Sequence, residues 1–97
     1  MKMFEARHLV IDGRVQGVGF RHGMTCAARA LGVSGWVRNR RDGCVEALIA
    51  GESTAIAALL AWVRRGPPGA RIDHVAVEFA EAAEQAATPE FSRRADA

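Results

Sequence analysis

Residues 14–21, RVQGVGFR, place two glycines between two arginines. The preceding run, RHLVIDG at residues 7–13, alternates with the period of two that is typical of a strand. Downstream, apolar residues recur at helical spacing as far as Gly32, so we expect a helix over residues 21–31. The segment therefore predicts a glycine loop that connects a strand to the start of a helix.

The rest of the chain predicts two more strands, a second helix and a further strand. Strands are expected at residues 34–41 and 44–50, because the Asp-Gly pair at 42–43 favours a tight hairpin turn. Ser53 can cap a second helix, which GPPG at residues 66–69 ends. The remaining expectations are a strand at residues 72–80, a loop at 81–88 and a short fifth strand at a sheet edge within 90–94.

The order strand-helix-strand-strand-helix-strand favours an α+β sandwich, with two helices on one face of an antiparallel sheet. We expect one domain over residues 1–97, with a core at about 5–94. The crossover makes the second strand run parallel to the first, with the third strand between them. Asn39 and the glycine loop should then lie at one edge of the sheet, roughly 10 Å apart.

The glycine loop has the composition of a phosphate-binding loop. Backbone amides can turn inward around an anion, Gly17 and Gly19 permit the positive φ values that this needs, and Arg21 offers a fork of donors. The candidate phosphate-binding residues are Gln16, Gly17, Val18, Gly19, Phe20 and Arg21. The spacing fits neither GxxxxGK nor GxGxxG, and no cysteine lies in the loop. From the residues alone, a plain strand-to-helix turn fits as well as a phosphate loop.

Charge and cysteine usage limit the partners and the compartment. The net charge is +2, but no acidic residue lies between Gly13 and Arg41, which fits either an anionic partner or a solvated basic face. The histidines and cysteines lack metal-ligand spacing, so we expect no metal. Cys26 and Cys44 form no CxxC pair; we expect buried, reduced thiols and a cytoplasmic location. Neither a signal peptide nor a membrane-spanning run is present, so no membrane partner is expected.

Three motifs together closely resemble the acylphosphatases: GRVQGVGFR at residues 13–21, LGVSGWVRN at 31–39 and DGCVE at 42–46. The resemblance extends over nearly the whole chain. It implies a small ferredoxin-like enzyme that hydrolyses acyl phosphates to a carboxylate and inorganic phosphate without metal or organic cofactor. It also implies that Arg21 binds phosphate and that Asn39 positions water. By itself, Asn39 would be interpreted as an ordinary turn residue.

The chain departs from the acylphosphatase pattern at His22-Gly23, where a bulky residue is expected, and in its tail, FSRRADA, which lacks an aromatic end. Both departures bear on substrate preference and stability. An RNA-recognition module has the same element order, but its aromatic motif lies on the third strand, so we expect no nucleic-acid partner. Two further functions fit this scaffold: a non-catalytic anion-binding domain and a module of a larger carbamoyl-phosphate-handling protein. We expect a free-standing monomer.

Overall fold

The structure, a computed structural model, describes residues 3–81 and 90–96 of the chain. The elements in these two ranges are β1 (Phe4–Arg14), α1 (Phe20–Leu31), β2 (Ser34–Asn39), β3 (Val45–Glu52), α2 (Ser53–Arg65), β4 (Arg71–Phe79) and β5 (Ser92–Arg93). The predicted order is confirmed, including the short fifth strand. Of the loop predicted at residues 81–88, all but Glu81 falls outside the described residues. None of the helices in these ranges has the length and apolar character needed to cross a bilayer.

Several strand ends differ from the prediction by one to three residues, and the end of β2 bears on the site. β1 starts earlier, because Phe4 still pairs with Glu52 of β3. β2 stops at Asn39 rather than at residue 41, because Arg40 already begins the turn: its N–H donates to the Cys44 carbonyl over 2.9 Å. Asn39 is therefore the last residue of β2, immediately beside the hairpin turn.

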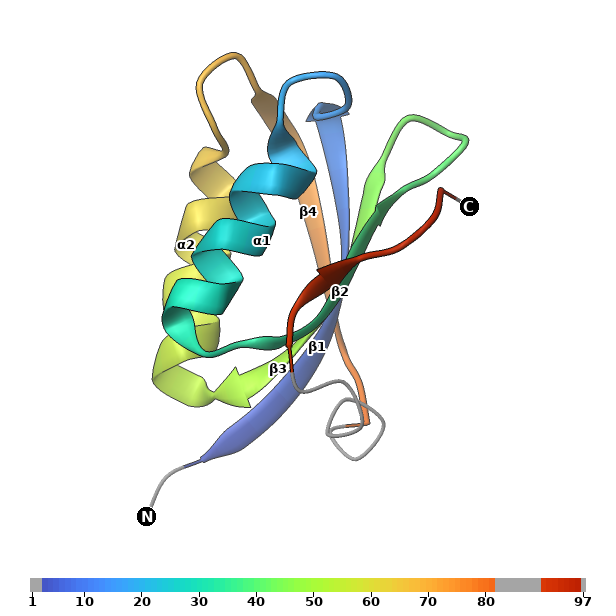
Figure 1. Cartoon of the computed structure of the whole chain (residues 1–97). Helices are drawn as coiled ribbons and strands as arrows, with labels where there is room; N and C mark the ends of the chain where they lie inside the picture. Colours follow the sequence, from blue (N-terminus) through green and yellow to red (C-terminus); the bar gives the residue numbers. More distant parts are fainter. Residues whose placement is uncertain (1–2, 82–89, 97) are drawn as a thin grey trace.

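The strands form one sheet in the order β4-β1-β3-β2-β5 (Figure 1). β3 lies between β1 and β2 and pairs antiparallel with both, so β1 and β2 run in the same direction. β4 pairs antiparallel with β1, which completes the predicted antiparallel part. β5 pairs parallel with β2, so the sheet as a whole is mixed.

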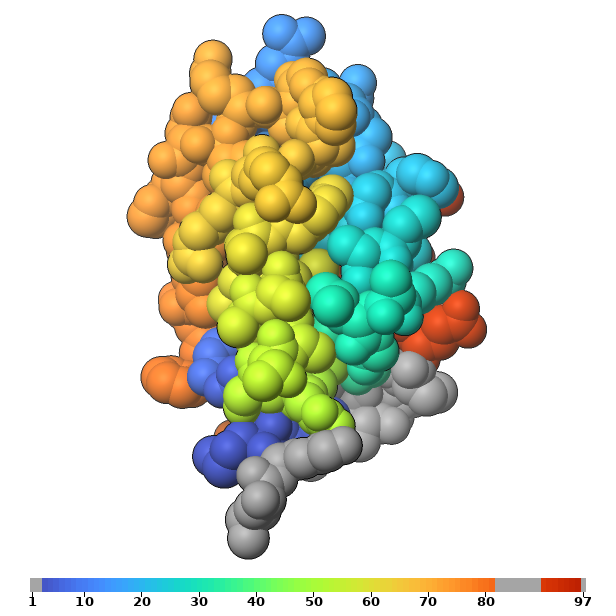
Figure 2. All heavy atoms as spheres, turned by 90° about the vertical axis from the view of Figure 1, so that its left-hand side faces the viewer, coloured from blue at the N-terminus to red at the C-terminus, as the bar shows by residue number. Residues whose placement is uncertain are grey.

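α1 and α2 cover one face of this sheet, as predicted (Figure 1). Figure 2 shows the two helices packed side by side over that face. Between the layers lies a core of fully buried side chains, which includes Leu9 and Ile11 of β1, Ile49 of β3, Met24 of α1 and Leu59 of α2. Burial of this apolar surface holds both ends of the glycine loop in place.

A charged cluster lies on the opposite face of the sheet. Glu46 of β3 accepts hydrogen bonds from His8 of β1 and Arg38 of β2, each at 2.7 Å. Burial of the Glu46 carboxyl raises its pKa, but these hydrogen bonds outweigh burial and keep the pKa below the ordinary value of 4.5. The cluster therefore ties the three central strands together through one ionised carboxylate.

Gly23 explains one of the departures from the family pattern. A Cβ at this position would lie 2.8 Å from Cζ2 of Trp62 on α2. The Trp62 ring also packs at a tilt of 58° on Phe20, with 5.3 Å between the ring centroids. The missing side chain at Gly23 thus makes room for a large ring at the contact between the helices.

We expect Gly23→Ala to destabilise the fold, although alanine favours a helix by about 1 kcal/mol relative to glycine. The added methyl group forces the Trp62 ring off Phe20, and such overpacking typically costs about 1–3 kcal/mol. In a Trp62→Phe background, which lacks the clashing ring atoms, the same substitution should become neutral or stabilising. Urea unfolding of the wild type, the two single variants and the double variant measures the change in the free energy of unfolding in each background. Destabilisation of equal size in both backgrounds would exclude Trp62 as the cause.

Glu46→Gln should weaken the dependence of stability on acid pH. Because folding lowers the pKa of Glu46, its stabilising contribution is complete above a pH of about 4.5 and is lost as the pH falls through the folded-state pKa. The wild type should therefore lose more of its free energy of unfolding on acidification than the variant. Urea unfolding of both proteins at a series of pH values from neutral to below about 4.5 tests this. An equal loss of the free energy of unfolding in the two proteins would contradict it.

Candidate active site

The glycine loop and the end of β2 line one small pocket, as the topology predicts. Its volume is about 110 Å³. The lining consists of Val15, Gly17, Gly19, Phe20, Arg21, His22, Asn39 and Arg93. The glycine loop and Asn39 lie close together because β1 and β2 run in the same direction and end at the same edge of the sheet. A loop of backbone donors, a guanidinium and a carboxamide are thus brought together.

The backbone of the loop is shaped by two glycines in the left-handed region. Gly17 has a φ of 76° and Gly19 a φ of 79°, values that only glycine adopts readily. Gly19 is also the N-cap of α1, where no side chain caps the helix and no acidic residue lies in the first turn. No carboxylate of the first turn therefore neutralises the N–H groups and the positive dipole end of α1, which suits an anion.

Gln16 fixes the loop to the β2–β3 turn through its side chain. The Nε2 group donates to the carbonyl oxygen of Arg40 over 2.8 Å and to that of Cys44 over 3.0 Å. Neither Gln16 nor Val18 lines the pocket, because the Gln16 side chain is held by the turn and the Val18 side chain packs against the core. Sequence reasoning placed both residues in the candidate loop but missed the Gln16 tether, because its partners are backbone groups more than twenty positions away.

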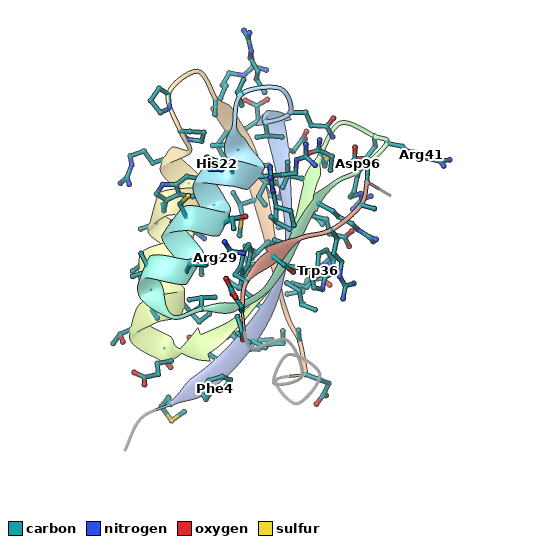
Figure 3. All side chains as sticks on the ribbon, viewed as in Figure 1. Phe4, His22, Arg29, Trp36, Arg41 and Asp96 are labelled. Carbon is teal, nitrogen blue, oxygen red and sulfur yellow. The ribbon has the colours of Figure 1, made fainter. Side chains whose placement is uncertain are left out.

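Arg21 lies in the first turn of α1, and its guanidinium pairs with Asp96. Nη1 lies 3.2 Å from Oδ1 of the carboxylate, and the two side chains are 34% and 61% exposed. An ion pair this exposed contributes little, typically about 0–1 kcal/mol. Asp96 and the site lie toward the same end of the molecule, where the loop after β1 is found (Figure 3). A phosphate group can therefore replace Asp96 at small energetic cost.

Asn39 carries an unusual polar atom. Its Oδ1 is buried and has no hydrogen-bond partner among the described residues. A buried acceptor left unpaired typically costs about 1–3 kcal/mol, so such an atom calls for an explanation. At the wall of a pocket lined by an arginine and a glycine loop, it can accept a hydrogen bond from a bound water.

The other arginines of the basic stretch point in several directions. Arg38 pairs with Glu46, and Arg40 pairs with Asp42 over 2.8 Å. Arg41 projects away from the molecule at the tip of the β2–β3 turn (Figure 3). The solvated-surface interpretation therefore fits these residues better than a role in the pocket.

The two cysteines differ from the prediction and from each other. Cys26 is exposed on α1, so the expectation of a buried thiol is wrong for it, and Cys44 is half-buried. Burial and the nearby carboxylates of Asp42 and Asp12 raise the pKa of the Cys44 thiol. A thiol held in its protonated form is a poor nucleophile, and neither cysteine lines the pocket.

Sequence reasoning did not find Arg93, His22 or Val15 as pocket residues, nor Asp96 as the partner of Arg21. His22 adjoins Arg21 and was identifiable by proximity alone. Arg93 and Asp96 reach the site only because β5 pairs with β2, which no pattern in a two-residue strand indicates.

In residues 3–81 and 90–96, no three His, Cys, Asp or Glu side chains gather closely enough to hold a metal ion.

Comparison with known proteins gives consistent matches. A model of the acylphosphatase family matches residues 7–92. An acylphosphatase of Acidiphilium cryptum is 51% identical over 90 residues, which cover 93% of this chain and 96% of that protein. The crystal structure of acylphosphatase from Bacillus subtilis has a TM-score of 0.87 at 34% identity and covers 95% of this chain and 99% of that one. Full-length HypF, in its phosphate- and nucleotide-bound form, has a TM-score of 0.86 at 28% identity, covering 99% of this chain and 12% of that one.

We expect Gln16→Ala to loosen the loop. The substitution removes both hydrogen bonds to the β2–β3 turn and leaves two carbonyl groups without this donor, a loss of about 1–3 kcal/mol in the free energy of unfolding. Amide hydrogen exchange at residues 16–20 should become faster than in the wild type. Gln16→Glu, which keeps the size but cannot donate to the carbonyls, should behave like the alanine variant. Unchanged exchange in the loop would show that the tether does not hold it.

Proposed function

The chain belongs to the acylphosphatase family, and on this premise we propose that Arg21 and Asn39 are its catalytic residues. It is an enzyme with acylphosphatase activity. The proposed reaction is hydrolysis of the anhydride bond between a carboxyl group and a phosphate, which yields a carboxylate and inorganic phosphate. The observation that carries the assignment is the single pocket shared by the glycine loop, Arg21 and Asn39.

The phosphate group is bound by the loop and Arg21. In the proposed complex the backbone amides of residues 16–20 turn inward and donate to phosphate oxygens, and the Arg21 guanidinium donates a pair of hydrogen bonds in place of the one to Asp96. The transition state of phosphoryl transfer spreads negative charge over three equatorial oxygens. Donors already fixed around those oxygens stabilise the charge without reorganising, which is the strongest contribution a protein can make to this reaction.

Asn39 positions the attacking water. Its Oδ1, which has no hydrogen-bond partner within residues 3–81 and 90–96, accepts a hydrogen bond from the water, whose oxygen is then directed at phosphorus. The new phosphorus–oxygen bond forms as the bond to the carboxyl oxygen breaks, and the electron pair leaves with the carboxylate. A carboxylate is stable without a proton, so no general acid is needed. The proton of the water passes to a phosphate oxygen, and a pH–rate profile with a basic limb from a protein side chain would contradict this step.

No metal or organic cofactor is part of this proposal, since Arg21 and the loop amides supply the positive charge. Nucleic-acid binding fits less well. On the face away from the helices, the central strands β1 and β3 present His8 and Glu46 instead of the stacked aromatic rings of an RNA-recognition module. A non-catalytic anion-binding domain would bind phosphate without turnover, which an assay of hydrolysis separates.

We propose further that residues 1–97 form one catalytic domain and that this domain acts as a monomer. The support is that the loop, Arg21 and Asn39 all come from the same chain, so no second copy is needed to complete the pocket. A reducing cytoplasmic location is proposed from the free thiols of Cys26 and Cys44. The substrate is an acyl phosphate, bound through its phosphate group.

Arg21→Ala and Asn39→Ala should each lower kcat for benzoyl phosphate by about 100- to 1000-fold, because each removes an interaction with the transition state. The assay contains a chelator, and near-ultraviolet circular dichroism confirms that each variant is folded. Arg64→Ala, which removes an exposed arginine at the end of α2, is the matched control and should retain full activity. Folded wild-type protein without turnover would contradict the proposed function, and full activity in either site variant would remove that residue from it.

A further inference from the structure

Arg93 of β5 lies on the same side of the sheet as the catalytic groups. β5, the short red strand beside β2 in Figure 1, pairs parallel with β2. In this pairing Arg93 is opposite Val37. Neighbours in a pleated sheet point to the same face, and Val37 is fully buried beneath the helices. Asn39 lies two positions further along β2 and so shares this face. The Arg93 side chain accordingly lines the pocket together with Arg21 and Asn39.

The next residue, Arg94, points the other way. Its guanidinium lies 4.5 Å from the ring centroid of Trp36. Trp36 projects from the side of the sheet opposite the helices (Figure 3). The backbone N–H of Arg94 donates to the Val37 carbonyl over 2.8 Å, so both arginines belong to the same short paired segment. Arg94, the residue that follows β5, therefore offers a control with the same charge and exposure class but the opposite direction.

The two arginines of the pocket differ in their partners. Arg21 forms an ion pair with Asp96. Arg93 has no ion pair or side-chain hydrogen bond in the described ranges, 3–81 and 90–96, and it is exposed to solvent. Of the pocket arginines, Arg93 is thus the one whose charge no carboxylate in these ranges offsets. An unneutralised cation beside a pocket raises its positive potential and attracts anions to it.

We propose that Arg93 is a second phosphate-binding residue, which contacts the phosphoryl group of the substrate from the β5 side. The inference rests on the proposed function, because it places the phosphate in the pocket of Arg21 and Asn39. An acyl phosphate presents a phosphoryl dianion, and Arg21 supplies one positive charge. Arg93 supplies the second, and its planar fork of donors suits phosphate oxygens. It binds substrate and product and takes no part in directing the water.

A structural role for Arg93 makes a different prediction. Charged residues on edge strands protect a sheet from pairing with other chains, and β5 is an edge strand. In that role the charge matters for solubility, and Arg93 and Arg94 would be interchangeable. A phosphate-binding role depends on the direction of the side chain and separates the two residues.

The test compares Arg93→Gln, Arg93→Lys and Arg94→Gln with the wild type. Inorganic phosphate is titrated directly, by the chemical shifts of the loop amides, and benzoyl phosphate hydrolysis gives KM and kcat. Arg93→Gln should weaken phosphate binding and raise KM about three- to fivefold at low ionic strength, as expected for loss of one partly exposed charge contact. kcat should stay within about twofold of the wild type, since the water is directed by Asn39. Arg93→Lys, which keeps the charge but not the fork of donors, should recover part of the affinity, and Arg94→Gln should match the wild type.

Wild-type phosphate affinity in Arg93→Gln, or an equal loss in Arg94→Gln, would overturn the inference. A loss of kcat with unchanged KM in Arg93→Gln would also overturn it, because the residue would then act on the chemical step. Because the phosphate titration measures binding without turnover, a failure of this inference can be told apart from a failure of the proposed function. Folded wild type that binds phosphate through Arg93 but turns over no acyl phosphate would sustain the inference about the site and overturn the catalytic proposal.

Discussion

The pairing of β3 with both of its neighbours is the constraint on which the site depends. Because β3 runs antiparallel to β1 and to β2, those two strands point the same way and end at the same edge. The glycine loop follows one of them, and Asn39 ends the other. The tether from Gln16 to the carbonyls of Arg40 and Cys44 then fixes the loop against the turn after β2. Without this topology, Arg21 and Asn39 would have no reason to meet.

The site combines groups that stabilise a charged ligand more than they stabilise the protein. The Oδ1 atom of Asn39 is buried without a partner among the described residues, the N-terminus of α1 has no side-chain cap, and the ion pair of Arg21 with Asp96 is exposed and weak. Each leaves polar capacity that a phosphate group and a water can satisfy. The apolar core between sheet and helices supplies the stability that these groups do not. The core between sheet and helices thus provides the rigidity, and the unsatisfied polar groups lie at the site.

The sequence predicted the element order, the glycine loop and its proximity to Asn39, because periodicity, turn residues and the crossover rule are local or topological signals. It did not predict Arg93 or Asp96 at the site, since their positions depend on a parallel pairing of only two residues. The buried thiol expected at Cys26 was wrong because Phe20, Met24 and Ala28 define the buried face of α1, and residue 26 lies on the other side. The sequence also did not explain why residue 23 departs from the acylphosphatase pattern, because the Trp62 ring that occupies the space of its side chain lies on the other helix.

The most direct test of this account is a crystal structure of the protein with inorganic phosphate bound. The account predicts phosphorus in the pocket lined by Gly17 and Gly19, with its oxygens within hydrogen-bond distance of the loop amides and the Arg21 guanidinium. An ordered water or a phosphate oxygen should lie on Oδ1 of Asn39, and Asp96 should have left Arg21. Phosphate bound elsewhere, for example between Arg29 and the start of β5, with the Arg21–Asp96 pair intact, would contradict the account.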